Sequence, residues 1–153
     1  MIEYELLQKL YSLEGIKGMS LFTELKNIQK EIDSTCFTDD QVSFCFCCDM
    51  VSMDLSDLNP LKEILVKNKV IASDDVVTLT KVDAPTEDVE SICEEWHFKE
   101  SITDRLSRIV ENADGYYRIW ADGTYASYGY LWSTCRLLQK GNEFYLLEFY
   151  ICD

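Results

Sequence analysis

The segment from Glu143 to Ile151 constrains the fold most, because as a strand it is apolar on both faces. One set of alternate residues comprises Phe144, Leu146 and Tyr150, and the other comprises Tyr145, Leu147 and Phe149. A strand of this kind has to be covered on both sides. We therefore predict that residues 143–151 form a central strand with further layers packed on both faces of its sheet.

The apolar period changes at Gly115, which we predict to stop a helix. After it, alternating residues in 116–120, 125–138 and 143–151 are separated by the turn sequences Asp122-Gly123 and Lys140-Gly141-Asn142. This order is typical of antiparallel hairpins. The C-terminal third is therefore predicted to be a β-meander.

Helical spacing dominates most of the chain before Gly115. The apolar stripes predicted to be buried are Leu21, Leu25, Ile28 and Ile32, then Val89, Ile92, Cys93 and Trp96, and then Leu106, Ile109 and Val110. The pattern predicts one helix over residues 2–14 and others that begin at Ser20, Asn59, Thr86 and Ser101. Ser20 and Asn59 are the expected N-caps of their helices. Ser101 and Asp104 resemble a capping box. Strands are expected at 41–50, where Phe46 and Cys48 alternate with Cys47 and Asp49, and near 76–82. The predicted fold class is α+β, with N-terminal helices packed on a mainly antiparallel sheet.

Length and composition indicate one domain, residues 1–153, without a linker. No apolar run approaches the roughly 20 residues of a membrane helix. The acidic start, with Glu3 and Glu5, does not resemble a secretory signal. The seven cysteines cannot all pair with one another, which favours reduced thiols. We expect a cytoplasmic protein that does not bind membranes.

The net charge of −14 is concentrated in two segments. Residues 31–61 and 82–98 contain seven and six acidic residues and no lysine or arginine. Such a field repels nucleic acid and attracts basic proteins, although a solvated face is the alternative. The candidate partner-binding acids are Asp39, Asp40, Asp54, Asp57, Asp83, Glu87, Asp88, Glu90, Glu94 and Glu95.

Aromatic residues gather in the C-terminal meander, where they either pack in the core or anchor a partner. We select as candidate anchors Tyr125, Tyr128, Tyr130 and Trp132. They lie in or beside a stretch too polar and small to be entirely core.

The cysteine-rich strand invites a metal-site interpretation, with Cys36, Cys45, Cys47 and Cys48 as ligands. The spacing does not match zinc-binding pairs, and in a strand Cys48 points away from Cys45 and Cys47. We therefore expect structural cysteines, no metal requirement for folding and no cofactor.

No catalytic motif occurs in the chain. Cys93 and His97 stand four residues apart on a predicted helix and would be the nucleophile and base of a small intracellular enzyme. Because acidic neighbours would raise the pKa of the thiol, we expect no catalytic residues here.

In size, charge, compartment and lack of motifs, the chain resembles the small acidic immunity proteins with which bacteria neutralise toxins. The resemblance rests on this character alone and carries over no site residue. It implies an inhibitor that occludes the cationic cleft of a basic protein such as a nuclease toxin, with no direct nucleic-acid binding. The alternatives are a DNA-mimicking antagonist of a nucleic-acid-binding enzyme and the Cys93/His97 enzyme.

Overall fold

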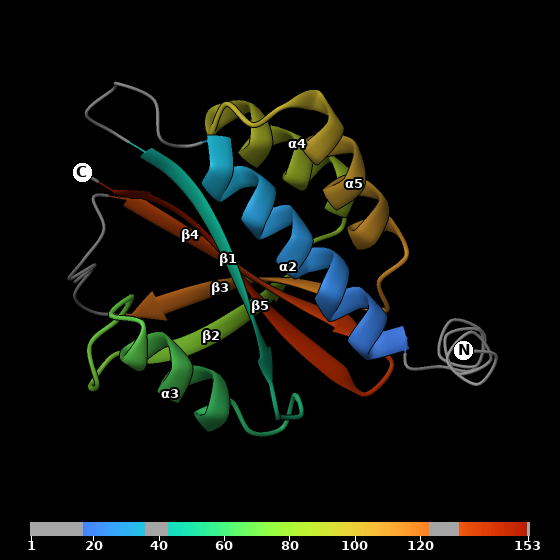
Figure 1. The fold of residues 1–153 in the computed structure, drawn as a ribbon. Coiled ribbons are helices and arrows are strands. Elements are labelled where there is room, and N and C mark those ends of the chain that lie inside the picture. Colours follow the sequence, from blue (N-terminus) through green and yellow to red (C-terminus); the bar gives the residue numbers. More distant parts are fainter. Residues whose placement is uncertain (1–16, 36–42, 123–131, 153) are drawn as a thin grey trace, which may run out of the picture.

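The computed structural model describes residues 17–35, 43–122 and 132–152 (Figure 1). In chain order the elements are α2 (Lys17–Thr35), β1 (Ser43–Val51), α3 (Asn59–Lys67), β2 (Val76–Lys81), α4 (Pro85–Glu95), α5 (Glu100–Glu111), β3 (Gly115–Asp122), β4 (Trp132–Lys140) and β5 (Glu143–Cys152). The α+β prediction is confirmed. The predicted helix over residues 2–14 lies outside the described residues.

The described strands form one antiparallel sheet in the order β1-β5-β4-β3-β2. The predicted meander is confirmed, since β3, β4 and β5 are neighbours in sequence and in the sheet. Gly123 of the predicted Asp122-Gly123 turn and the predicted strand residues 125–131 lie outside the described residues. Lys140 pairs with Glu143 across the tight turn that joins β4 to β5. Gly141 takes φ +60° at the first turn position, where glycine avoids the steric strain of a side chain.

Strand β5 lies inside the sheet, between β1 and β4, and both of its faces are covered as predicted. Tyr145, Leu147 and Phe149 belong to one hydrophobic cluster, and Phe144 and Leu146 belong to a second one. None of the five side chains is more than 4% exposed. Because alternate residues of a strand point to opposite faces, the two clusters lie on opposite faces of the sheet.

The first cluster lies beneath α2, α4 and α5, which cover what we call the three-helix face (Figure 1). The helices contribute the stripes that the sequence predicted, namely Leu25, Ile28 and Ile32 from α2, Val89, Ile92 and Cys93 from α4, and Leu106, Ile109 and Val110 from α5. Trp96 follows α4, is 1% exposed, and donates from Nε1 to the Tyr150 carbonyl at 3.2 Å. The three helices are therefore fixed to the sheet by apolar side chains.

The second cluster lies beneath α3, on what we call the α3 face. Leu61 and Leu65 of α3 are fully buried against Val51, Leu137 and Leu146. Helix α3 is short, and it lies over one end of the sheet in Figure 1. Beyond it, the same face carries the polar side chains of β1 and β5 that are described below.

The outer edge of β1 is closed at Cys48 by two side chains of α2. Lys26 donates from Nζ to the Cys48 carbonyl at 2.7 Å, and the Gln29 side-chain oxygen accepts from the Cys48 N–H at 3.2 Å. As predicted, Phe46 and Cys48 are buried on one face of this strand, whereas Met50 is 40% exposed.

Several predicted helix boundaries were wrong. Helix α2 begins at Lys17, so Ser20 lies inside it. At α3 the N-cap is Leu58, with no side-chain cap hydrogen bond, so Asn59 is not the cap. Helix α5 begins at Glu100, after Lys99 as N-cap, with no side-chain cap hydrogen bond, so the Ser101–Asp104 capping box does not form. Polar residues are common near helix starts, and spacing alone does not show which one accepts the hydrogen bond.

Gly115 does not stop a helix, because α5 ends at Glu111 with Asn112 as its C-cap. Gly115 instead begins β3 and pairs with Gln139. A Cβ at this position would lie 2.9 Å from Gln139 Oε1 and from the Tyr117 ring. Close approach of neighbouring side chains, not helix termination, explains glycine here.

Candidate interaction surface and a cysteine–carboxylate cluster

The exposed side of α4 is acidic along its whole length. Because Val89, Ile92, Cys93 and Trp96 face the sheet, the helical period turns Glu87, Glu90, Glu94 and Glu95 outward, and all four are exposed. Asp83, just before the helix, is exposed as well. None of these five carboxylates forms a hydrogen bond or ion pair within the described part of the chain. We call these five residues the α4 acidic face.

The neighbouring helix α5 has a mixed surface. Its exposed side carries Glu100, Asp104 and Glu111 together with Arg108, and Lys99 precedes it. Arg105 forms an ion pair with Glu31 of α2. Of these two helices, only α4, with its N-terminal flank, therefore has an exposed surface without basic residues.

Asp88 differs from its neighbours on α4, because its carboxylate is turned inward. It accepts hydrogen bonds from Arg136 Nε at 2.8 Å, Arg136 Nη2 at 3.0 Å and the Tyr116 hydroxyl at 2.7 Å. Burial acts to raise the pKa of Asp88, but the hydrogen bonds from Arg136 and Tyr116 outweigh it and hold the pKa below its usual value. Asp88 neutralises a buried guanidinium and belongs to the interior of the fold.

Of the acids of the first segment, Glu31 and Asp33 belong to α2, and others lie on the opposite face. Asp54 and Asp57 are exposed in the loop that leads to α3, on the face opposite α4. Hydrogen bonds from Ser56 lower the pKa of Asp54, and the Asp57 carboxylate accepts from the Asn59 N–H at 3.0 Å. Asp39 and Asp40 lie outside the described residues. Asp54 and Asp57 therefore do not belong to the same surface as the α4 acidic face.

The structure describes one of the four predicted aromatic anchors. Tyr125, Tyr128 and Tyr130 lie outside the described residues, and Trp132 is described only as the β4 residue that pairs with Ile151. An exposed aromatic that the sequence did not single out is Trp120, which is 41% exposed. The Arg118 guanidinium carbon lies 4.1 Å from the centroid of its ring, within cation–π range.

A small cavity of about 120 Å³ opens where β3 and β4 separate beyond the Arg118–Arg136 pair. Its walls include Leu65, Ile71, Ile119 and Cys135. Pockets for small-molecule ligands usually have about 300–1,000 Å³, so this cavity is small for a substrate.

Cys93 and His97 do not form the pair that the helical spacing suggested. Helix α4 ends at Glu95, and His97 takes φ +59°. The Cys93 side chain is fully buried in the cluster on the three-helix face, and burial raises the pKa of its thiol to about 11. His97 is exposed and meets the Phe44 ring edge-on at 5.1 Å. A buried thiol and an exposed imidazole are a poor nucleophile and base.

The cysteines of β1 also separate as predicted. Cys48 is buried on the three-helix face, whereas Cys47 lies on the opposite face of the same strand. Cys36 lies outside the described residues. A site made of all four cysteines is therefore incompatible with the positions of Cys47 and Cys48.

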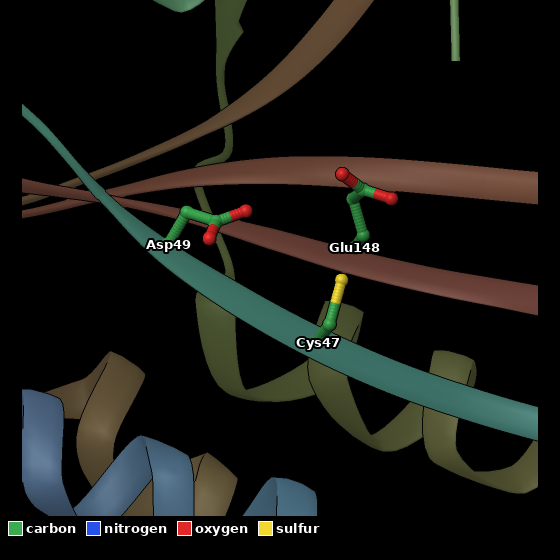
Figure 2. A group of neighbouring side chains, drawn as sticks. All are labelled: Cys47, Asp49 and Glu148. Carbon is green, nitrogen blue, oxygen red and sulfur yellow. The ribbon is translucent and has the colours of Figure 1, made fainter. Parts of the chain in front are cut away.

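On its own face Cys47 meets two carboxylates, from Asp49 and Glu148 (Figure 2). The Cys47 sulfur and one oxygen of each carboxylate lie within 4.8 Å of one another. The register of β1 on β5 places Cys47 opposite Glu148. Sequence reasoning missed this group, since Glu148 belongs to a distant part of the chain and carries no local motif.

Comparisons with known proteins support the architecture alone. No family model and no curated protein matches the sequence. Among solved structures, a crystal structure of citrus MAF1 matches with a TM-score of 0.51 and 12% sequence identity. The match covers 84% of this chain and 98% of that chain. At this identity the likeness shows a shared fold.

No described helix is long and apolar enough to cross a membrane.

Proposed function

We propose that this protein is an immunity-type inhibitor, which acts in the cytoplasm by binding a basic protein and occluding its cationic substrate-binding cleft. A nuclease toxin is the class of partner that fits best, because its cleft must carry the positive charge that holds a polyanion. The observation that carries the proposal is the α4 acidic face.

The arrangement of that face supports binding more than solubility alone. Glu87 and Glu94 lie seven residues apart, which is about 10 Å along a helix, and Glu90 lies between them. The underside of α4 is anchored by Val89, Ile92 and Cys93, so the carboxylates start from a fixed backbone. Fixed charges of one sign accelerate encounter with a surface of the opposite sign.

Local helix stability accounts for only part of the α4 acidic face. Glu87 lies in the first turn of α4, where a negative charge favours the helix dipole. Glu94 and Glu95 lie in the last turn, which contains no basic residue and where the dipole opposes negative charge. Their presence is consistent with a role outside the helix.

The experiment is capture of partners from the lysate of the source cells, followed by a nuclease assay on the captured protein. The test variant is E87Q/E90Q/E94Q/E95Q. The matched control, E24Q/E63Q/D74N/E111Q, removes four exposed charges outside α4. We expect wild type and control to capture and inhibit the same basic nuclease, and the test variant to lose most of that inhibition.

Three results would refute the proposal: capture of no basic protein, equal inhibition by both variants, or capture that leaves nuclease activity unchanged. If the captured proteins are instead nucleic-acid-binding proteins that duplex DNA displaces from the α4 acidic face, the DNA-mimic function replaces the proposal.

A further inference from the structure

The α3 face of the sheet gathers a thiol and two carboxylates from two adjacent strands. Cys47 and Asp49 lie two residues apart on β1 and therefore point to the same side. Glu148 of β5 stands directly opposite Cys47 (Figure 2). The ligand atoms, one sulfur and two oxygens, lie within 4.8 Å of one another.

The surroundings of the three groups are those of an enclosed site. Glu148 is fully buried, and Cys47 and Asp49 are half-buried. Asn68, the residue after α3, donates from its side-chain amide to Glu148 Oε1 at 2.8 Å and to Asp49 Oδ2 at 3.2 Å. One amide therefore orients both carboxylates. Outer hydrogen bonds of this kind usually accompany carboxylates that bind metal ions.

The electrostatics of the group favour a cation. The two carboxylates, from adjacent strands, face the same thiol, and one of them, Glu148, is fully buried. A divalent ion would attract both carboxylates and displace the thiol proton, as metals do at cysteine ligands.

We propose that Cys47, Asp49 and Glu148 bind a divalent cation of the zinc class. The combination of one thiolate with two carboxylates fits this class, because magnesium and calcium avoid sulfur and copper(I) avoids carboxylates. Three protein ligands and one water complete the usual four-coordinate geometry. Binding forms the metal–sulfur bond and releases the thiol proton to solvent.

The distances are compatible with this coordination after a small rearrangement. In a tetrahedral zinc site the sulfur and oxygen ligand atoms stand roughly 3.5 Å apart. The present separations are within 4.8 Å, so coordination requires the ligand atoms to move closer together by about 1 Å or less. Asn68 then acts as the outer hydrogen-bond donor.

The test is titration of the metal-free full chain, under reducing conditions, with Co²⁺ alone and then displacement by Zn²⁺. We expect one equivalent of cobalt, with thiolate-to-cobalt charge-transfer absorption in the near ultraviolet. Calorimetry in two buffers of different ionisation enthalpy should show proton release. Zinc should remove the absorption band.

Variants locate the site. C47S should abolish the charge-transfer band, and E148Q and D49N should each weaken binding by more than about tenfold. N68A should weaken it by about 10-fold to 100-fold as an outer-shell change. The matched control is C45S, two residues earlier on the same face of β1, which should bind as wild type does.

Circular dichroism of each variant checks folding, and D49N gives the result for carboxylate removal if E148Q fails to fold. The proposal is overturned if no charge-transfer band appears, if C47S binds cobalt like wild type, or if C45S loses binding while C47S keeps it. Cobalt that binds without a thiolate band and is lost in E87Q/E90Q/E94Q/E95Q would place the ion at the α4 acidic face and would also refute the site. None of these results depends on the inhibitor function.

Discussion

Arg136 of β4 and Asp88 of α4 form a two-pronged ion pair, in which Nε lies 2.8 Å from Oδ2 and Nη2 lies 3.0 Å from Oδ1. The guanidinium is almost completely buried, with 3% of the residue exposed. Its remaining donors reach Thr134 Oγ1 at 2.7 Å and the Cys135 carbonyl at 3.0 Å. The pair joins the helix that carries the acidic face to the middle of the sheet.

We predict that D88A is strongly destabilising, because it leaves a buried guanidinium without its counter-charge. The expected loss is about 3–5 kcal/mol of the free energy of unfolding, measured by urea titration. The control is E87A, one residue earlier and exposed, which should change stability by about 0.5 kcal/mol or less. Equal effects of the two variants would show that the ion pair does not stabilise the fold.

The same pair predicts a pH dependence of stability. Because the folded-state pKa of Asp88 is lowered, its contribution is fully present above the unfolded pKa of about 3.9 and is lost as the pH falls through the lower folded pKa. Urea midpoints of wild type should therefore fall more steeply below about pH 4 than those of D88N. Parallel curves for the two proteins would contradict this assignment.

The thiols should differ in reactivity in the native protein. Cys93 and Cys48 are fully buried, and burial raises their thiol pKa values to about 11 and about 12. At pH 8 we expect both to resist iodoacetamide until the chain unfolds, as read by peptide mass spectrometry. After anaerobic purification and denaturation, all seven thiols should react. Five or fewer reactive thiols would reveal disulfides, and rapid native labelling of Cys93 would contradict its burial.

Association with the captured partner should depend on salt. In E87Q/E90Q/E94Q/E95Q we expect association to slow by about tenfold or more at low ionic strength and its salt dependence to flatten. The variant should still fold, since exposed charges contribute only about 0–1 kcal/mol each. Stopped-flow measurement against ionic strength, with E24Q/E63Q/D74N/E111Q as the control, decides the question. Identical salt dependence of the association rate for both variants would show that the α4 acidic face is only a solvated surface.

The aromatic anchors are expected to act on the dissociation rate constant. If Tyr128 or Trp132 fills a pocket of the partner, Y128A or W132A should raise the dissociation rate and leave the association rate nearly unchanged. Surface plasmon resonance separates the two rates. W120A is an informative comparison, because Trp120 is an exposed aromatic residue of β3. An unchanged dissociation rate in Y128A and W132A would remove both residues from the interface.

The sequence predicts those features of the fold that depend on local period. The apolar alternation of 143–151 correctly indicated a strand covered on both faces, and the stripe of α4 correctly placed Val89 and Ile92 inward. The same stripe held an unused signal for Asp88, which stands four residues before Ile92 and thus borders the buried side. Only the position of Arg136, on a distant strand, makes that burial favourable.

The cluster of Cys47 with Glu148 could not be predicted in this way. Their contact depends on the pairing of β1 with β5, which joins segments far apart in the chain. A shift of the register by one residue would turn Glu148 to the other face, and no local pattern specifies that register uniquely. Caps were mispredicted for a related reason, since a polar residue near a helix start, such as Asn59 or Ser101, need not be the one that stands at the cap.

The hydrogen bonds from Lys26 and Gln29 to Cys48 have a consequence for polymerisation. They occupy the backbone in the middle of β1, so a foreign strand cannot dock along that side of the sheet without displacing α2. Among the described strands, β2 is the other border of the sheet. If two molecules paired through their β2 strands, both β2 edges would be occupied, and the assembly would stop at two subunits. Growth into a fibre requires two open borders, and the described strands leave at most one.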